Sequence, residues 1–133
     1  MNKTLKGRTA EKQCEKQLIS EGYTLTWKTI RSKWQNIDYF GLFDVIGRKG
    51  KNTIYVQVKT VGKHSSSPNI RTIEQTKGSK GISISDFVQY HRNEYESVEV
   101  WIFYNARMRG RGKNRKYEKP RLERIKIEKC LHR

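Results

Sequence analysis

The sequence is short of hydrophobic residues and of long apolar runs. Only 34% of its 133 residues are hydrophobic, while 32% are charged, so the core must be small and must come from a few concentrated apolar segments. No segment approaches the apolar length needed to span a bilayer, and the first residues, MNKTLKGRTAEK, lack the apolar stretch of a signal peptide. We therefore expect one compact domain over residues 1–133, without membrane contact, that works in the cytoplasm in association with the nucleoid.

Cysteine and histidine are also scarce. The two cysteines, Cys14 and Cys130, are far apart and form no C-x-x-C pair, and the chain has 3 His. This composition argues against a zinc site, which is built from several such ligands. We expect Cys14 to be a small buried residue on a helix and Cys130 to be an incidental thiol.

Acidic residues are few compared with basic ones. Lys and Arg number 29 and Asp and Glu 13, which gives a net charge of +16. A merely soluble basic protein is the plain alternative, but so large an excess repels itself unless a polyanion offsets it. Nucleic acid is therefore the first partner to expect, well ahead of a membrane surface.

Apolar periodicity divides the chain into an early helix, several strands and two basic loops. Thr9 is available to cap the first helix and Gly22 to end it. Two segments are expected to be basic loops: 61–81, rich in Ser, Gly and Lys, and 105–119, rich in Lys and Arg with two glycines. The order of these helices and strands along the chain predicts an α/β fold with a central mixed β-sheet flanked by helices. Its expected elements are a helix at 9–21, a strand at 23–29, a polar loop at 30–39, a hairpin of 40–47 and 53–60, a short strand and then a helix within 82–97 capped by Ser85 or Asp86, a strand at 98–105 buried on both faces, and an edge strand at 122–129.

The hairpin FDVIG…YVQVKT holds polar side chains where a sheet core normally avoids them. If Asp44 pairs opposite Gln57, a turn over 49–52 closes an ordinary antiparallel ribbon. Strand alternation then places Gln57 and Lys59 on one face, and a bend in the strand brings both beside Asp44. These polar groups need partners, which are either structural or catalytic.

A second carboxylate comes from the first helix. Glu11 borders the apolar stripe of Cys14 and Leu18 and should approach Asp44 if the helix packs on the sheet. Carboxylate and amide oxygens suit Mg²⁺, which keeps waters for attack on a phosphate. Lys59 would orient that water, lower its pKa or offset charge in the transition state.

Each of these residues also has a structural interpretation. Asp44 would be a turn or strand residue, Lys59 a strand-end charge in solvent, and Glu11 an acid interacting with the helix dipole. The three together in a chain of charge +16 favour the catalytic interpretation. Glu15, one turn after Glu11, either assists the metal or pairs with lysines on the helix face.

The two motifs together resemble the PD-(D/E)XK nuclease superfamily. The stretch KGRTAEKQCEKQLISEGY, followed by FDVIG and YVQVKT, is most similar to archaeal and viral Holliday junction resolvases. The matching helix positions are Lys6, Gly7, Glu11, Gly22 and Tyr23. The resemblance covers the first 60 residues and continues beyond them as an order of elements.

The resemblance implies a restriction-endonuclease-like fold and assigns roles to individual residues. Glu11, Asp44 and Gln57 would bind Mg²⁺, for which Mn²⁺ would substitute, and Lys59 would be the motif lysine. Gln57 stands where the motif has Asp or Glu, a variant also similar to that of some homing endonucleases, and an uncharged amide should bind the metal less tightly. Phe43 stands where many members have Pro.

The implied activity is hydrolysis of phosphodiester bonds by a metal-dependent DNA endonuclease, most similar to a structure-selective Holliday junction resolvase. One alternative is a sequence-specific homing or restriction-type endonuclease whose basic loops read bases. The other is a non-catalytic DNA-binding relic of the fold. A resolvase cuts two strands, so the resemblance implies a homodimer or higher assembly, with VEVWIF or DFVQYHRNEYES at the interface, and a viral source would place it in a host cytoplasm.

Basic side chains outside the hairpin should bind the phosphates of branched or duplex DNA, with strong salt dependence. Three aromatic residues in the loop before the hairpin, Trp34, Tyr39 and Phe40, would contact sugars or stack on an unpaired base. The alternative is that Phe40 belongs to the core and Trp34 covers it. The predicted phosphate-binding residues are Lys6, Arg8, Lys12, Arg31, Lys33, Lys63, Arg107, Arg109 and Arg111.

Overall fold

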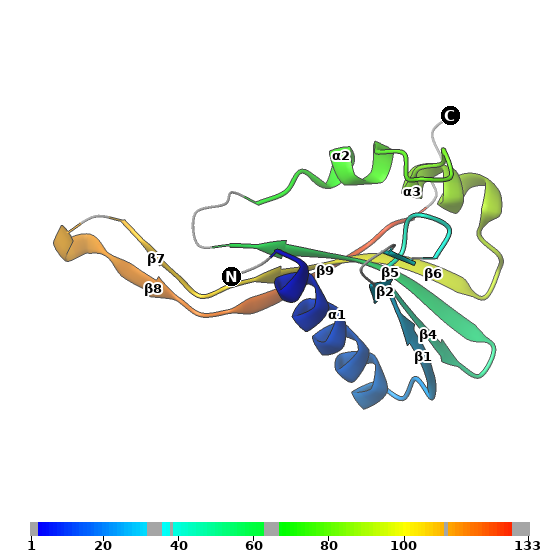
Figure 1. Ribbon diagram of the computed structural model, residues 1–133, viewed down its shortest axis with the longest axis horizontal. Helices are drawn as coiled ribbons and strands as arrows, with labels where there is room; N and C mark the ends of the chain where they lie inside the picture. Colours follow the sequence, from blue (N-terminus) through cyan, green and yellow to red (C-terminus); the bar gives the residue numbers. More distant parts are fainter. Residues whose placement is uncertain (1–2, 32–35, 38, 63–66, 111, 129–133) are drawn as a thin grey trace.

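A five-stranded mixed sheet forms the centre of the computed structural model (Figure 1). The structure describes the backbone of residues 3–31, 36–37, 39–62, 67–110 and 112–128, and the side chains of 9–30, 39–62, 67–106, 108, 110 and 112–128. The strand order is β1-β4-β5-β6-β9, in which β5 and β6 run parallel and the other neighbours antiparallel. The strands are β1 (Leu25–Lys28), β4 (Val45–Lys49), β5 (Asn52–Val61), β6 (Glu96–Tyr104) and β9 (Arg121–Lys126).

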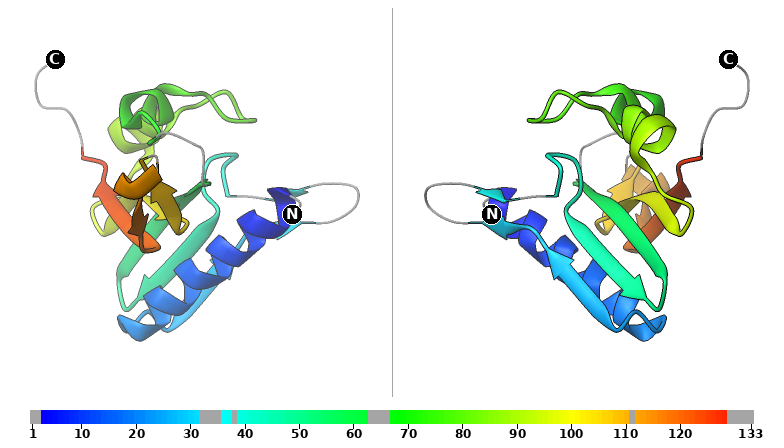
Figure 2. Two further views of the ribbon diagram at one scale, coloured as in Figure 1. Left: turned by 90° about the vertical axis from the view of Figure 1, so that its left-hand side faces the viewer. Right: turned by 90° about the vertical axis from the view of Figure 1, so that its right-hand side faces the viewer.

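Helices cover both faces of this sheet (Figure 2). Helix α1 (Lys3–Ser20) lies on one face, and α2 (Ile70–Gln75), α3 (Ile84–Asp86) and the π-helix η1 (Phe87–His91) lie on the other. The predicted α/β class, a restriction-endonuclease-like mixed sheet flanked by helices, is confirmed. No helix in the described ranges is both long and apolar enough to cross a membrane.

Helix α1 ends where the sequence predicts and begins earlier. Gly22, at φ +99°, donates its N–H to the Ile19 carbonyl at 3.0 Å, and the Tyr23 N–H reaches the Leu18 carbonyl at 3.0 Å. This pair of bonds is the Schellman motif that closes a helix at glycine. Thr9 lies inside α1 rather than at its start, because most residues from Lys3 onward tolerate a helix.

The face covered by α1 is apolar. Cys14 and Leu18 are fully buried there, and burial is the main reason why the pKa of the Cys14 thiol is well above its usual value. The prediction that Cys14 is a buried helix residue is confirmed. The sheet residues packed in the same cluster include Val45, Ile54, Val56 and Trp101.

The opposite face packs against the segment 82–91. Ser83 caps α3 by accepting from the Asp86 N–H at 3.1 Å, while the Asp86 carboxylate accepts from the Ser83 N–H at 3.0 Å. The predicted cap at Ser85 or Asp86 is therefore wrong by a few residues, and 82–85 is not a strand. The core residues of this face include Tyr55, Phe87, Val98, Val100 and Ile102.

Three segments predicted as loops contain regular structure. Helix α2 lies within 61–81, because Asn69 accepts from the Thr72 N–H at 3.2 Å and caps it. Within 105–119, β7 (Arg107–Arg109) pairs with β8 (Lys116–Glu118) around the short helix η2 (Gly112–Asn114), and the ribbon projects beyond the sheet (Figure 1). In the 30–39 segment, β2 (Ile30–Arg31) pairs with β3 (Asn36–Ile37).

Candidate metal and phosphodiester site

The β4–β5 hairpin has the predicted register. Val45 pairs with Val56 and Lys49 with Asn52, which places Asp44 opposite Gln57. Strand β4 begins at Val45, but β5 continues to Val61. Over residues 57–61, β5 is paired with β6 on one side, while its edge toward β4 is bordered by Asp44 instead of a strand.

The Asp44 carboxylate is fixed against this edge of β5. Its Oδ2 accepts from the Val58 N–H at 2.9 Å, and its Oδ1 accepts from the Thr29 hydroxyl at 3.3 Å. The Asp44 N–H donates to the Val56 carbonyl at 2.9 Å. A carboxylate held by its neighbours in this way is oriented before any ligand arrives, which suits a metal ligand.

Gln57 stands apart among the buried side-chain polar atoms of the described residues. Its side-chain oxygen Oε1 is buried and has no hydrogen-bond partner among the described residues. A buried carbonyl oxygen in this state costs about 1–3 kcal/mol, and such a group calls for a specific explanation, of which a bound ion is one. Lys59, two residues further along β5, is half-buried and lies on the same face by alternation.

Glu11 approaches from the other side of the sheet. Its side chain is 2% exposed on α1, and α1 packs on the face of β5 opposite to Gln57 and Lys59. After burial, the negative charges of Asp44, Glu99 and Glu11 are further causes that raise the pKa of the Cys14 thiol. Cys14 on α1 is therefore close enough to both Asp44 and Glu11 for their charges to act on it.

These donors match a hard divalent cation. Two carboxylates and an amide oxygen are ligands that Mg²⁺ accepts. The described residues include no group of three or more His, Cys, Asp or Glu that could hold a metal ion. A metal at Asp44 would therefore need a ligand of another type, and the unpaired Gln57 oxygen is of that type, whereas Glu11 lies across the sheet from Gln57.

Two threonines anchor this region in a way that no sequence motif indicates. Thr29, only 5% exposed, donates its N–H to the Asp44 carbonyl at 2.6 Å. Thr26 donates its hydroxyl to Glu15 at 2.8 Å and ties α1 to β1. Glu15 therefore has a structural partner in β1, which neither of the two sequence interpretations anticipated.

A curated relative shows the family. The chain is 30% identical over 102 residues to the UPF0102 protein of Aquifex aeolicus (strain VF5), in a match that covers 74% of this chain and 98% of that protein. This chain belongs to the UPF0102 family. No family model matches the chain, and the comparison with solved structures finds no match.

The predicted DNA-binding residues of this UPF0102 chain lie mostly outside the described side chains. Lys12 is exposed on α1. Of the others, Lys33, Lys63 and Arg111 lie outside the described residues, as does Trp34, while the backbone alone is described for Lys6 and Arg8 in α1, Arg31 in β2, and Arg107 and Arg109 in β7.

One of the two predicted dimer segments lies in the interior of the sheet. Strand β6 lies inside the sheet between β5 and β9, so VEVWIF offers no free edge for a second copy of this UPF0102 chain. The other segment, 86–97, exposes Tyr90 and Tyr95.

Proposed function

We propose that this UPF0102 chain is a metal-dependent DNA endonuclease that hydrolyses phosphodiester bonds at the edge of β5 beside Asp44. The observation that carries the proposal is the buried, unpartnered Gln57 oxygen next to a carboxylate held in place. A net charge of +16 supports DNA as the substrate.

Asp44 and Gln57 would hold Mg²⁺, with Mn²⁺ as a substitute. Glu11, the third ligand predicted from the sequence, is buried with α1 on the opposite face of β5 from Gln57. The bound ion would supply Lewis-acid stabilisation of a phosphate oxygen and would lower the pKa of a water molecule. Val58 and Thr29 keep the Asp44 carboxylate in place through their hydrogen bonds. Lys59 would place a positive charge where negative charge grows on the phosphate during hydrolysis.

We propose branched DNA as the preferred substrate, because the helix motif and the hairpin motif together resemble junction resolvases. Two symmetric cuts at a four-way junction require two copies of the site, so a homodimer is part of this proposal.

A sequence-specific endonuclease is the second candidate, favoured by the β7–β8 ribbon. A two-stranded ribbon fits the major groove of DNA, where bases can be distinguished. This ribbon exposes Met108 and Tyr117, which pair across its two strands.

The test is cleavage of a labelled synthetic four-way junction beside a linear duplex of the same sequence, with Mg²⁺, with Mn²⁺ and with EDTA. Symmetric metal-dependent nicks near the branch are expected. Cleavage at one sequence of the linear duplex alone would favour the second candidate. DNA binding without cleavage in either metal would contradict both and leave a DNA-binding relic of the fold.

The matched variants are Asp44→Asn and Lys59→Met, with Lys51→Met as the control. Lys51 lies at the exposed tip of the same hairpin, far along β5 from Lys59. Loss of cleavage in the first two variants and retention in the third would assign the chemistry to this edge. Equal activity in all three variants would show that the chemistry does not take place at this edge of β5.

A further inference from the structure

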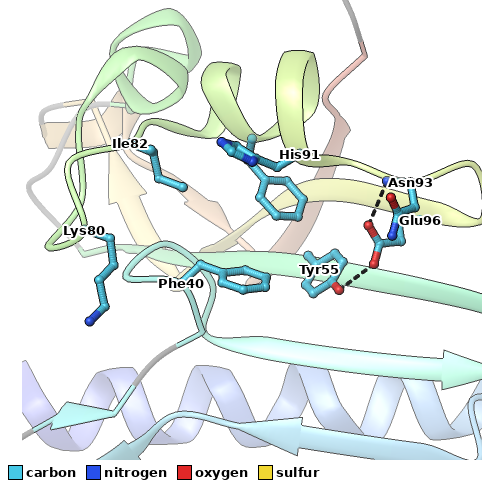
Figure 3. Close-up of a pocket in the computed structure, with 8 residues that line it drawn as sticks. Phe40, Tyr55, Lys80, Ile82, His91, Asn93 and Glu96 are labelled. Atoms are coloured by element: carbon cyan, nitrogen blue, oxygen red, sulfur yellow. Dashed lines mark hydrogen bonds between the residues drawn. The ribbon is translucent and has the colours of Figure 1, made fainter.

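A cavity of about 420 Å³ opens on the sheet face that bears Tyr55 (Figure 3). It lies between β5 and the helical segments, with Phe40, Tyr55 and Phe87 among its lining residues. Its size falls within the roughly 300–1,000 Å³ of small-ligand sites, which are mostly apolar with a few polar groups.

Phe40 is held at this cavity in a strained conformation. Its φ is 59°, a left-handed value that is unfavourable for a bulky residue, and its side chain is 44% exposed. The next residue, Gly41, is also left-handed at φ 70°. Its carbonyl packs closely on Gly78: a Cβ on residue 78 would lie 2.1 Å from the Gly41 carbonyl oxygen. Backbone strain that the surroundings maintain is typical of ligand-binding positions.

Phe40 packs against other aromatic rings at this cavity, but it is not the core residue that the sequence predicted. Phe40 lies 5.4 Å from Phe87 at an interplanar angle of 34°, and Tyr55 meets Phe87 edge to face at 5.2 Å. Phe40 is the exposed member of this group, whereas Tyr55 and Phe87 are buried. An aromatic face at the mouth of an apolar cavity suits a flat, uncharged ring.

The two ends of the cavity differ in charge. At one end, the Glu96 carboxylate accepts from the Tyr55 hydroxyl at 2.7 Å and from the Asn93 N–H at 2.9 Å (Figure 3). This negative end disfavours a phosphate and suits the N–H groups of a base edge. At the other end, Lys80 is exposed and can meet a phosphate of the strand.

The cavity lies on the same face of β5 as Gln57 of the proposed cleavage site. Tyr55 and Gln57 are two residues apart on one face of the strand, a separation of roughly 7 Å. A nucleotide beside the cleaved phosphate would therefore lie within reach of the cavity.

We propose that this cavity receives one unpaired nucleobase of the bound DNA strand, which stacks on Phe40. The proposal rests on the proposed function for its substrate class. It gives the chain a physical reason to prefer DNA with unpaired nucleotides, as at branches and bulges, over a fully paired duplex.

The test measures binding in EDTA, so that its outcome does not depend on cleavage. One DNA is a duplex with a single bulged 2-aminopurine, and the other is the same duplex fully paired. Phe40→Gly removes the ring and suits the left-handed backbone, so the variant should keep its melting temperature. Phe40→Tyr keeps an aromatic face, and Tyr90→Ala is the control, because Tyr90 is 70% exposed on the adjacent η1.

Phe40→Gly should weaken binding to the bulged DNA about tenfold, since stacking contributes about 1–3 kcal/mol per base. It should leave binding to the paired duplex unchanged and abolish the stacking quench of 2-aminopurine fluorescence. Phe40→Tyr and Tyr90→Ala should behave like the parent protein. An unchanged affinity of Phe40→Gly for the bulged DNA, or an equal loss for both DNAs, would overturn the proposal even if the chain cleaves DNA.

Discussion

The two faces of β5 are built from the same run of residues and have opposite character. Ile54, Val56 and Val58 point toward α1 and form a closed apolar core. Tyr55, Gln57 and Lys59 point the other way, where a cavity opens and one carbonyl oxygen lacks a partner. Both faces contribute to the core, but the α1 face is apolar along β5, whereas the other passes from the buried ring of Tyr55 to polar groups that need a ligand to be satisfied.

The largest effect is expected from charge removal at the polar face. Lys59→Met and Asp44→Asn should each lower the cleavage rate by roughly 100-fold to 1,000-fold, as removal of one group that stabilises developing charge does in other enzymes. Cleavage of the four-way junction under single-turnover conditions measures this effect. A reduction below tenfold, with the fold intact by circular dichroism, would place the chemistry elsewhere.

The apolar face should respond to mutation through stability instead. Ile54 is 1% exposed, so Ile54→Ala should lower the free energy of unfolding by about 2–5 kcal/mol. Urea denaturation measures the loss. At a temperature where the variant is still folded, its metal-dependent cleavage should match the parent rate. A specific loss of metal dependence would show that the apolar face also takes part in metal binding.

Gln57→Glu should strengthen metal binding on the polar face. A second carboxylate beside Asp44 replaces an uncharged amide among the proposed ligands, so Mg²⁺ should bind about tenfold more tightly, which corresponds to about 1.4 kcal/mol. Calorimetric titration with Mg²⁺ measures the change in affinity. Gln89, a half-buried residue of η1, provides the control for added charge as Gln89→Glu. Weaker Mg²⁺ binding in Gln57→Glu would argue against a metal at this position.

The smallest effect concerns Tyr55 at alkaline pH. Burial, and then the hydrogen bond to Glu96, raises the pKa of Tyr55 above its usual 10.0. The unfolded chain loses this proton near pH 10 while the folded chain keeps it, so stability should be constant below that pH and fall above it. Tyr55→Phe should remove this part of the decline in melts recorded between pH 9 and 11, and an identical decline in both proteins would contradict the assignment.

The hairpin and its polar residues could be predicted because their signals are local. Alternation in FDVIG and YVQVKT fixes the register that places Asp44 opposite Gln57. Gly22 ends α1 because only a left-handed residue closes that turn without strain. The position of Glu11 across the sheet from Gln57 depends on tertiary packing, which the sequence pattern does not contain.

The missed elements have other causes. The β7–β8 ribbon has only Met108 opposite Tyr117 as a large apolar pair, so its basic composition conceals the alternation. Helix α2 is short and depends on its Asn69 cap. From composition alone, this segment is classified as part of a loop. The cavity at Phe40 forms from segments that are distant in sequence, so no motif marks it.

Thermal melts of the parent protein and of Gln57→Leu, in EDTA and in excess Mn²⁺, test the central claim most directly. Leucine removes the unpartnered oxygen and keeps similar volume, so the variant should melt at or above the parent temperature in EDTA. Mn²⁺ should stabilise the parent through binding to the folded state and should have little effect on the variant. A lower melting temperature of Gln57→Leu in EDTA, together with an unchanged response to Mn²⁺, would contradict the account.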